Sequence, residues 1–490
     1  MAHKPLTSGV LRDNRMHVNV EHFKGVTDDS LAVEFALESR KRMRWVGQWG
    51  KWFVWTGQKW ELDHIYRPYE SLREFMRAKA REVGEAAYKE KMGQVTSDST
   101  EAIQRMALQS AHAARRAVHV SMLSSRTINS VANMVSKDKR IAVSVDIWDQ
   151  DPWLLNTPDG IVNLRSGELV PHEPTRFLTK TTKVGPKPGE PTLWLAFLNK
   201  IMHNDQEMVR YLQKIFGYCL VGTTKEHQMY FGYGTGANGK GVTLNTMRDL
   251  LGDYGVEANI ETFVASAHDR HPTELADLRG ARLVTCGETD EGQRWAEARI
   301  KMLTGGDPVK ARFMRQDFFT YVPQFKLFLA GNHKPRLQNI DEAIERRFRL
   351  IPFTYTVPKP ERDTDLAEKL KLEWPQILQW AIDGCLAWQA EGLDAPVIVA
   401  DATKSYLAQE DAITAWWNEC CLSVPDSRYT TEKDLFESWR KWAFENGESP
   451  GTKRLLSKHL EDREPVLKIR RVRKTDGMSF TGVQLRDMDS

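Results

Sequence analysis

The sequence predicts an α/β protein built around a phosphate-binding loop (P-loop), with an N-terminal helical and β-hairpin module and a C-terminal winged-helix module. Three observations indicate this. A strand-like run at 228–233 leads through a glycine-rich loop into a helical pattern, two later apolar runs each end in a polar side chain, and the last 60 residues read as helix, helix and strand pair. A length of 490 residues is enough for three or four domains.

Composition excludes several classes of protein. Hydrophobic residues make up 41% and charged residues 28%, as in an ordinary globular protein, and no apolar run reaches the about 18 residues that a membrane span needs. The first residues lack the apolar core of a signal peptide, so we expect a cytoplasmic protein. Five cysteines without metal-ligand spacing are expected to be buried, reduced thiols. The net charge of +3 does not by itself indicate nucleic-acid binding.

The N-terminal part divides into two segments. Residues 1–145 are expected to form a helical module that begins with a loose arm, has a capped helix start at Thr27, carries a tryptophan-rich β-hairpin at 45–60 and continues as a helical bundle from 71 to about 137. Residues 146–200 are expected to form short strands joined by Asp-Gly and Ser-Gly turns, followed by a proline-rich linker. The tryptophans either fill a small core, which is the commoner use, or stack on bases.

The motif with the clearest chemistry lies between Gly234 and Gly241, in a segment 201–360 that we expect to be the ATPase core. Glycines allow backbone N–H groups to surround a polyphosphate, the following helix N-terminus favours anions, and Lys240 supplies a positive charge for the outer phosphates. The alternative is a glycine-rich turn before an ordinary helix. The predicted nucleotide-binding residues are Gly234, Thr235, Gly236, Ala237, Asn238, Gly239, Lys240, Gly241 and Val242.

Magnesium coordination departs from the usual motif, because Gly241 occupies the position that normally carries Ser or Thr. Thr243 is about 200° further round the helix and is not a simple replacement. The apolar strand at 281–287 ends at Glu288, which we expect to order Mg²⁺ or polarise the attacking water. A surface acid after a core strand is the alternative.

Further motifs follow in order along the chain. Residues 301–307 include Lys301 and Asp307, a third apolar strand ends at Asn332, and Arg346 and Arg347 come just before another strand. An amide at the end of a strand beside a P-loop is suited to sensing the γ-phosphate or holding water. Between these motifs, residues 308–321 read as a hairpin with Lys310 and Arg312 on one face and Arg315 near the tip, a candidate for DNA contact through phosphates. Exposed cations on a hairpin are otherwise common solubility devices.

This set of motifs, from about Trp148 to the C-terminus, resembles superfamily 3 helicases, specifically the phage and plasmid primase-helicase family related to the poxvirus-type primase-helicases. The resemblance implies an AAA+-like ATPase core that assembles as a ring, commonly a hexamer, and moves on single-stranded DNA from 3′ to 5′. It implies that Glu288 is the B-motif acid, that 301–307 is the segment that follows it, that Asn332 is sensor 1, and that Arg347 or Arg346 is the arginine finger. ATP and Mg²⁺ are the implied cofactors.

A ring also follows from the chemistry of an arginine finger. Such a residue meets a phosphate that its own subunit does not easily present to it, so the site is completed at a subunit interface. We therefore expect Arg347 to act in trans and its removal to spare ATP binding but abolish hydrolysis.

The C-terminal third is predicted to be a helical extension at 361–424, with Gly392 ending a helix, and a winged-helix module at 425–490. Nine basic residues against three acids between 453 and 474 form the strongest positive cluster in the chain. Duplex DNA binding is the functional interpretation, with a protein partner as the alternative. The predicted DNA contacts here are Lys453, Arg454, Lys458, Arg470, Arg471 and Arg473.

The sequence therefore favours an ATP-dependent, ring-forming DNA helicase of phage, prophage or plasmid replication, with single-stranded and forked DNA and possible primase or other replication proteins as partners. Two alternatives stay open. One is an origin-binding initiator that uses ATP as an assembly switch without unwinding, and the other is a primase-helicase that retains priming activity, for which no catalytic acid pair or zinc pattern is evident.

Overall fold

The computed structural model describes residues 26–266, 273–287, 293–314, 317–337, 340–410, 412–448 and 450–486. These residues belong to two compact units. The first runs to Gln150 and takes in Pro171–Lys180, and the second comprises Asp151–Val170 and the chain from Thr181 onward. No helix in the described ranges has the length and apolar character that crossing a membrane requires. The expected N-terminal arm at 1–26 lies outside the described residues except for its last position.

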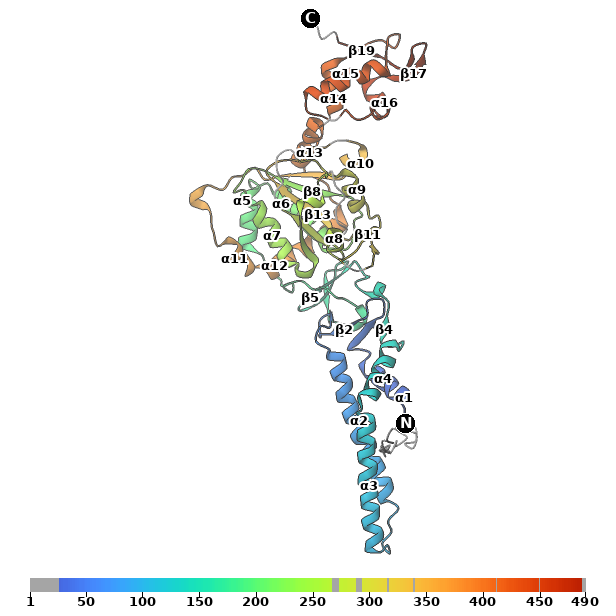
Figure 1. Cartoon of the computed structure of the whole chain (residues 1–490). Coiled ribbons are helices and arrows are strands. Elements are labelled where there is room, and N and C mark those ends of the chain that lie inside the picture. Colours follow the sequence, from blue (N-terminus) through green and yellow to red (C-terminus); the bar gives the residue numbers. More distant parts are fainter. Residues whose placement is uncertain are drawn as a thin grey trace, which may run out of the picture. The chain divides into compact units, whose positions relative to one another are not determined.

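The first unit combines a small sheet with a long helical hairpin (Figure 1). The sheet has the strand order β3-β2-β1-β4, with β4 parallel to β1. Thr27 begins α1 with a capping box, because its hydroxyl accepts from Ser30 N at 3.1 Å and Ser30 Oγ accepts from Thr27 N at 2.8 Å. The elements are α1 (Asp28–Ser39), β1 (Met43–Val46), β2 (Lys51–Trp55), β3 (Trp60–Leu62), α2 (Arg67–Met92), α3 (Glu101–Met122), α4 (Ser125–Lys137) and β4 (Ala142–Val143).

The tryptophan-rich segment forms the predicted strands, and its aromatic rings fill a core. Trp60 is fully buried, and Phe53, Trp148 and Phe177 pack around it. The rings of Phe53 and Trp148 stack with centroids 4.6 Å apart. Trp49, in the turn between β1 and β2, is the exception at 40% exposed. Most of these aromatics therefore stabilise the small sheet.

The second unit is organised around a five-stranded parallel sheet with the order β14-β8-β13-β10-β9. The first of these strands along the chain, β8, lies between the last two, β13 and β14, so the strand order reverses at β8. In open parallel sheets, ligands bind beyond the carboxyl ends of the strands at such a reversal. The strands are β8 (Met229–Tyr233), β9 (Gly255–Ala258), β10 (Leu283–Cys286), β13 (Lys326–Gly331) and β14 (Phe348–Pro352).

Helices and smaller strands cover this sheet. The two helices predicted before the glycine-rich loop are present almost as expected, as α5 (Thr192–Ile201) and α6 (Gln206–Leu220). A meander of β5 (Leu154–Thr157), β6 (Gly160–Asn163) and β7 (Glu168–Val170) precedes them. The others are α7 (Lys240–Leu250), α8 (Thr273–Ala276), α9 (Glu297–Gly305), β11 (Val309–Ala311), β12 (Phe319–Tyr321), α10 (Glu342–Glu345), α11 (Leu366–Lys371), α12 (Trp374–Glu391) and α13 (Val397–Glu410). Gly392 ends α12 with φ +78°, as predicted.

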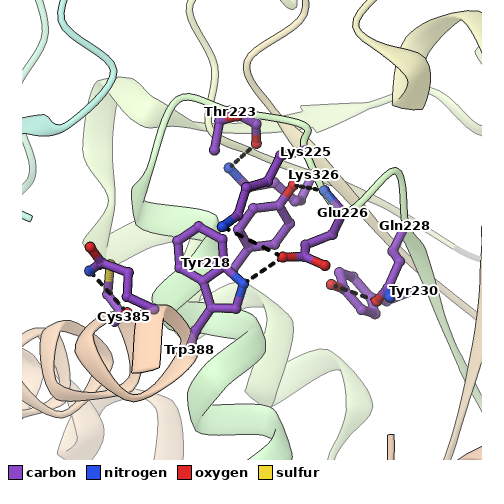
Figure 2. A network of polar contacts seen from close by, with 10 residues as sticks. Tyr218, Thr223, Lys225, Glu226, Gln228, Tyr230, Lys326, Cys385 and Trp388 are labelled. Atoms are coloured by element: carbon purple, nitrogen blue, oxygen red, sulfur yellow. Dashed lines mark hydrogen bonds and ion pairs between the residues drawn. The ribbon is translucent and has the colours of Figure 1, made fainter. Parts of the chain in front are cut away.

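Two buried cations close the carboxyl end of α6 against the sheet. Figure 2 shows one of them, Lys326, beside Tyr218 and Thr223. Arg282, just before β10, donates to the carbonyl of Leu220, and Lys326, at the start of β13, donates to the carbonyl of Val221. The Lys326 ammonium also lies 4.6 Å from the centre of the Tyr218 ring. Burial lowers the pKa of Lys326 to about 7. Unpaired carbonyls at a helix end attract cations, so these side chains replace water there.

The C-terminal residues form a separate hydrophobic core that contains Trp416, Trp439 and Phe480. This core includes α14, so the boundary predicted at 425 falls inside it. The second predicted strand at 478–485 is divided at Gly482, which has φ +80°, and its last part pairs with β15 instead. The elements are α14 (Ala412–Cys420), β15 (Cys421–Ser423), β16 (Tyr429–Thr431), α15 (Glu432–Glu445), α16 (Lys453–Asp462), α17 (Glu464–Leu467), β17 (Arg470–Lys474), β18 (Gly477–Thr481) and β19 (Val483–Leu485).

All five cysteines are buried free thiols, as the sequence predicts.

Candidate functional site

The glycine-rich loop at 234–239 connects the carboxyl end of β8 to the start of α7, as the sequence predicts. Gly234 and Gly239 both have left-handed φ angles, +150° and +84°. A Cβ atom on Gly234 would lie 2.1 Å from the carbonyl oxygen of Phe353, and one on Gly239 would lie 2.9 Å from Ile201. Glycine is therefore required at both positions for the loop to keep its path.

Lys240 lies over the loop rather than in solvent. Its Nζ donates to the carbonyl of Gly234 at 2.5 Å and to Oδ1 of Asn332 at 3.2 Å. The lysine is 8% exposed, and Asn332 follows directly after β13, the neighbouring strand. Two predicted site residues that are 92 positions apart in the sequence are thus in direct contact. A cation in this position can bind phosphate oxygens that enter the loop.

The segment after β14 forms one wall of the loop. Asn238 is buried and donates from Nδ2 to Phe353 O at 2.9 Å, and Val357 N donates to Ala237 O at 2.8 Å. Thr235 Oγ1 lies 3.2 Å from Thr356 Oγ1. Sequence analysis did not identify this segment, because its residues carry no motif and reach the loop only through the parallel pairing of β14 with β8.

The residues present suit a nucleotide triphosphate, but the usual protein hydroxyl for Mg²⁺ is missing. Gly241 and Gly236 have open space where a Cβ would stand, so phosphates can approach the backbone there. Thr243 is buried and its hydroxyl donates to Gly239 O at 2.9 Å, which confirms that it does not replace the missing side chain. Glu288 lies outside the described residues, and within those that are described no group of three or more His, Cys, Asp or Glu side chains could hold a metal ion.

The two candidate arginine fingers differ in environment. Arg347 is 7% exposed, and its guanidinium donates to Thr304 Oγ1 at 3.1 Å and to Ala343 O at 2.8 Å. Burial, assisted by the nearby charge of Arg346, lowers the pKa of Arg347. Arg346 is exposed. Two of its guanidinium nitrogens are thus bonded inside its own chain, and the role of Arg347 in a neighbouring subunit stays a prediction.

Lys301 connects the segment 301–307 to the start of α10. Its Nζ lies 2.5 Å from Oδ2 of Asp341, and Asp341 caps α10 by accepting from Ile344 N at 2.9 Å. Burial raises the pKa of Asp341, but these two contacts outweigh it and leave the pKa below its usual value. The ion pair fixes the short helix that presents Arg346, while Asp307 lies exposed beyond α9.

The predicted hairpin at 308–321 is present as the antiparallel pair β11 and β12. Lys310 and Arg312 lie on the same face, and both cations contact the ring of Phe318. Lys310 Nζ lies 4.8 Å and Arg312 Cζ 4.7 Å from the ring centre. Arg315 lies outside the described residues. The sequence analysis missed Phe318, because this residue becomes a neighbour of the two cations only through the pairing of β11 with β12.

The basic C-terminal cluster is mostly exposed. Lys453, Arg454 and Lys458 lie on the outer side of α16, and Arg470 and Arg473 are exposed on β17.

Arg471 is different and corrects one prediction. Its guanidinium pairs with Glu432 at 2.6 Å and with Glu461 at 2.5 Å, and Glu432 is 8% exposed. The hydrogen bond to Glu432 raises the pKa of Arg471. Because this side chain holds α15, α16 and β17 together, we no longer count it among the DNA contacts.

Lys334 is a second cation near the loop that the sequence analysis missed. Its Nζ lies 4.1 Å from the centre of the Tyr233 ring, on the last residue of β8. The only sequence signal was its position two residues after Asn332.

Two family models match the chain. A model described as D5 N terminal like matches residues 32–203, and a family of unknown function, DUF5906, matches residues 232–347. The second match covers the glycine-rich loop, Asn332 and both arginines. The first extends the family likeness well before Trp148, where the sequence analysis had started it, and includes the tryptophan-rich sheet and the helical hairpin.

Curated viral proteins are similar to part of the chain. "Putative helicase L207/L206" of Acanthamoeba polyphaga mimivirus is 27% identical over 294 residues, which are 55% of this chain and 30% of that protein. "Primase D5" of Fowlpox virus is 26% identical over 148 residues, 29% of this chain and 18% of that protein. The chain thus spans less than a third of the length of these relatives.

Among solved structures, the apo form of the NrS-1 C-terminal region (305–718) covers 94% of this chain and is itself covered completely, with a TM-score of 0.50 at 10% identity. This likeness concerns the fold alone.

Proposed function

Because the chain is a relative of the poxvirus-type primase-helicases, we propose that it is an ATP-dependent DNA helicase of superfamily 3, with an AAA+-like core, that forms a ring, moves along single-stranded DNA and unwinds duplex during replication of phage, prophage or plasmid DNA. The observation that carries this proposal is the contact of Lys240 with Gly234 O and Asn332 Oδ1 at the carboxyl edge of the parallel sheet. Phosphate binding would explain why a buried lysine is held over a loop of glycines.

In this proposal the loop binds the triphosphate of ATP. Backbone N–H groups of 235–241 surround the phosphates, Lys240 exchanges its present acceptors for the β- and γ-phosphate oxygens, and Asn332 is left facing the γ-phosphate. Mg²⁺ would neutralise charge on the phosphates and would be held by phosphate oxygens, water and Glu288, since Gly241 offers no hydroxyl. Glu288 would also polarise the attacking water.

Arg346 is the better finger, and the sheet explains why it must act on a neighbour. Phe348 at the start of β14 pairs with Met229, and Pro352 at its end pairs with Tyr233, next to the glycine-rich loop. Arg346 comes before β14, so the length of the strand, about 15 Å, separates it from the loop of its own chain. An arginine side chain does not bridge that distance. In the proposed ring, the exposed Arg346 would contact nucleotide bound to the next subunit.

DNA contact would come from two basic surfaces. Lys310 and Arg312 on the β11–β12 hairpin would bind the phosphates of the translocated strand, and the exposed cations of α16 and β17, in winged-helix fashion, would bind duplex. The second surface also suits an initiator that binds an origin without unwinding it. Strand displacement from a fork distinguishes the two functions.

The test compares Lys240→Ala with Lys371→Ala, an exposed lysine whose partner is Glu368. We expect Lys240→Ala to lose ATP binding and fork unwinding, and Lys371→Ala to keep both. Wild-type hydrolysis per subunit should rise with protein concentration and with added single-stranded DNA. Equal activity of a dilute and a concentrated sample, with no response to DNA, contradicts the helicase proposal, and hydrolysis without strand displacement supports the initiator.

A further inference from the structure

The β11–β12 hairpin has two faces of opposite character. Val309 pairs with Tyr321 and Ala311 with Phe319, and Val309, Ala311 and Tyr321 are buried. Side chains alternate between the faces of a strand pair, so Lys310 and its partner Thr320 must point the other way, and both are exposed.

The buried face is anchored, which fixes the orientation of the exposed one. Tyr321 Oη donates to the carbonyl of Leu275 in α8 at 2.6 Å, and the Phe319 ring stacks on Phe313 with centroids 5.5 Å apart. The Arg279 guanidinium lies 5.1 Å from the centre of the Phe319 ring. The hairpin cannot turn over without losing these contacts.

Phe318 is the unusual residue of the exposed face. It is 49% exposed, and continuing the strand register sets it opposite Arg312, on the face that carries Lys310. Both cations contact its ring, with Nζ of Lys310 4.8 Å and Cζ of Arg312 4.7 Å from the centre. Cation–π contacts of exposed groups are weak, so they orient the ring without explaining why an apolar side chain is left in water. An exposed aromatic ring beside cations is an arrangement that binds single-stranded nucleic acid, with bases on the ring and phosphates on the cations.

We propose that Phe318 is a base-stacking residue for single-stranded DNA and that Lys310 and Arg312 hold the flanking phosphates. The inference rests on the proposed function, which requires only phosphate contacts from this hairpin, and adds a contact to the bases. Every base has a flat face, so this contact is insensitive to sequence but requires that a base be present.

The experiment measures the affinity of the full chain for two labelled oligonucleotides of equal length, oligothymidine and the same backbone without bases, over a range of salt concentrations. Wild type should bind oligothymidine more tightly, by about 5- to 100-fold if one or two bases stack. Phe318→Leu should remove most of this preference and leave the salt dependence unchanged, and Phe318→Tyr should retain the preference. Lys310→Ala should keep the preference and reduce the slope of log affinity against log salt by about one.

The outcomes separate the stacking inference from the helicase proposal. If Phe318→Leu keeps the full preference for bases while Lys310→Ala reduces the salt dependence, stacking is refuted and the hairpin remains a phosphate contact. If neither variant changes binding, the hairpin does not contact DNA. The stacking inference is then refuted, and the helicase proposal loses the hairpin as a DNA contact. If Phe318→Leu instead prevents oligomer formation, as seen by sedimentation, Phe318 belongs to a subunit interface and the inference is overturned. Thermal unfolding checks that each variant is folded.

Discussion

Replacing each of the two adjacent arginines separates folding from catalysis. Arg347→Ala removes a buried guanidinium that donates to Thr304 Oγ1 and Ala343 O. Two hydrogen bonds from a charged donor are lost and the part-buried carbonyl of Ala343 loses one of its donors, so we expect the free energy of unfolding to fall by about 3 kcal/mol. Arg346→Ala removes an exposed side chain and should change stability by no more than about 0.5 kcal/mol.

We expect the opposite order for ATP hydrolysis, with Arg346 mattering more than Arg347. Without Arg346 the rate of ATP hydrolysis should fall by about 10³-fold or more, with ATP binding retained. Arg347→Met, which keeps apolar volume at the buried site, should recover part of the stability lost in Arg347→Ala and keep hydrolysis. Chemical denaturation and steady-state hydrolysis, measured on the same preparations, check both statements.

Mixing two inactive variants tests the interface directly. Lys240→Ala subunits keep Arg346, and Arg346→Ala subunits keep an intact loop. In an equal mixture, roughly a quarter of subunit interfaces should unite an intact loop with an intact Arg346, and hydrolysis should return. A mixture no more active than its components, or full activity of Arg346→Ala alone, refutes the assignment of Arg346 as the residue that acts in trans.

Three other predictions follow from single contacts. Because nothing lies within 4 Å of a Cβ at Gly241, the structure should accommodate Gly241→Ser, which should tighten Mg²⁺-dependent ATP binding several-fold in titration calorimetry. Gly241→Ala adds no hydroxyl and should only raise the free energy of unfolding, by about 0.5–1 kcal/mol. Burial lowers the pKa of Lys326 to about 7, so above that pH the unfolded chain binds more protons than the folded one. The free energy of unfolding should therefore rise by up to about 1.4 kcal/mol per pH unit between about pH 7 and pH 10. Lys326→Met should remove this rise in urea unfolding curves recorded at pH 7 and pH 9. Arg471→Ala should destabilise the C-terminal core by about 3 kcal/mol in thermal unfolding, since it leaves buried Glu432 without its partner. Arg470→Ala should leave stability unchanged and weaken duplex DNA binding in a salt-dependent way.

Local patterns were sufficient to predict the strand, loop and helix around Lys240 and the capped start at Thr27. These features depend on residues within one or two turns of each other, where glycine and capping preferences act directly. The contact between Lys240 and Asn332 was also predictable in kind, because both follow strands of a parallel sheet whose carboxyl ends meet at one edge.

The environments of charged side chains were not predictable in the same way. Nothing local distinguishes Arg346 from Arg347, and their exposure is decided by where α10 ends and by Thr304 of α9. Lys326 and Arg282 lie buried beside the end of α6, about 60 to 105 positions earlier in the chain. They donate to backbone carbonyls there that have no donor within the helix. Arg471 belongs to a basic run in the sequence, but the fold brings Glu432 and Glu461 beside it.

Strand β14 links Arg346 rigidly to the glycine-rich loop of the same chain. One end follows the exposed Arg346, and the other continues into Phe353, whose carbonyl accepts from Asn238 in the glycine-rich loop. Extended backbone bonded to a neighbouring strand resists compression along its axis, so an axial push at the arginine would reach the loop at the far edge with little loss. In the proposed ring, release of nucleotide from one subunit would in this way alter the glycine-rich loop of the next, and hydrolysis would pass from subunit to subunit in one direction.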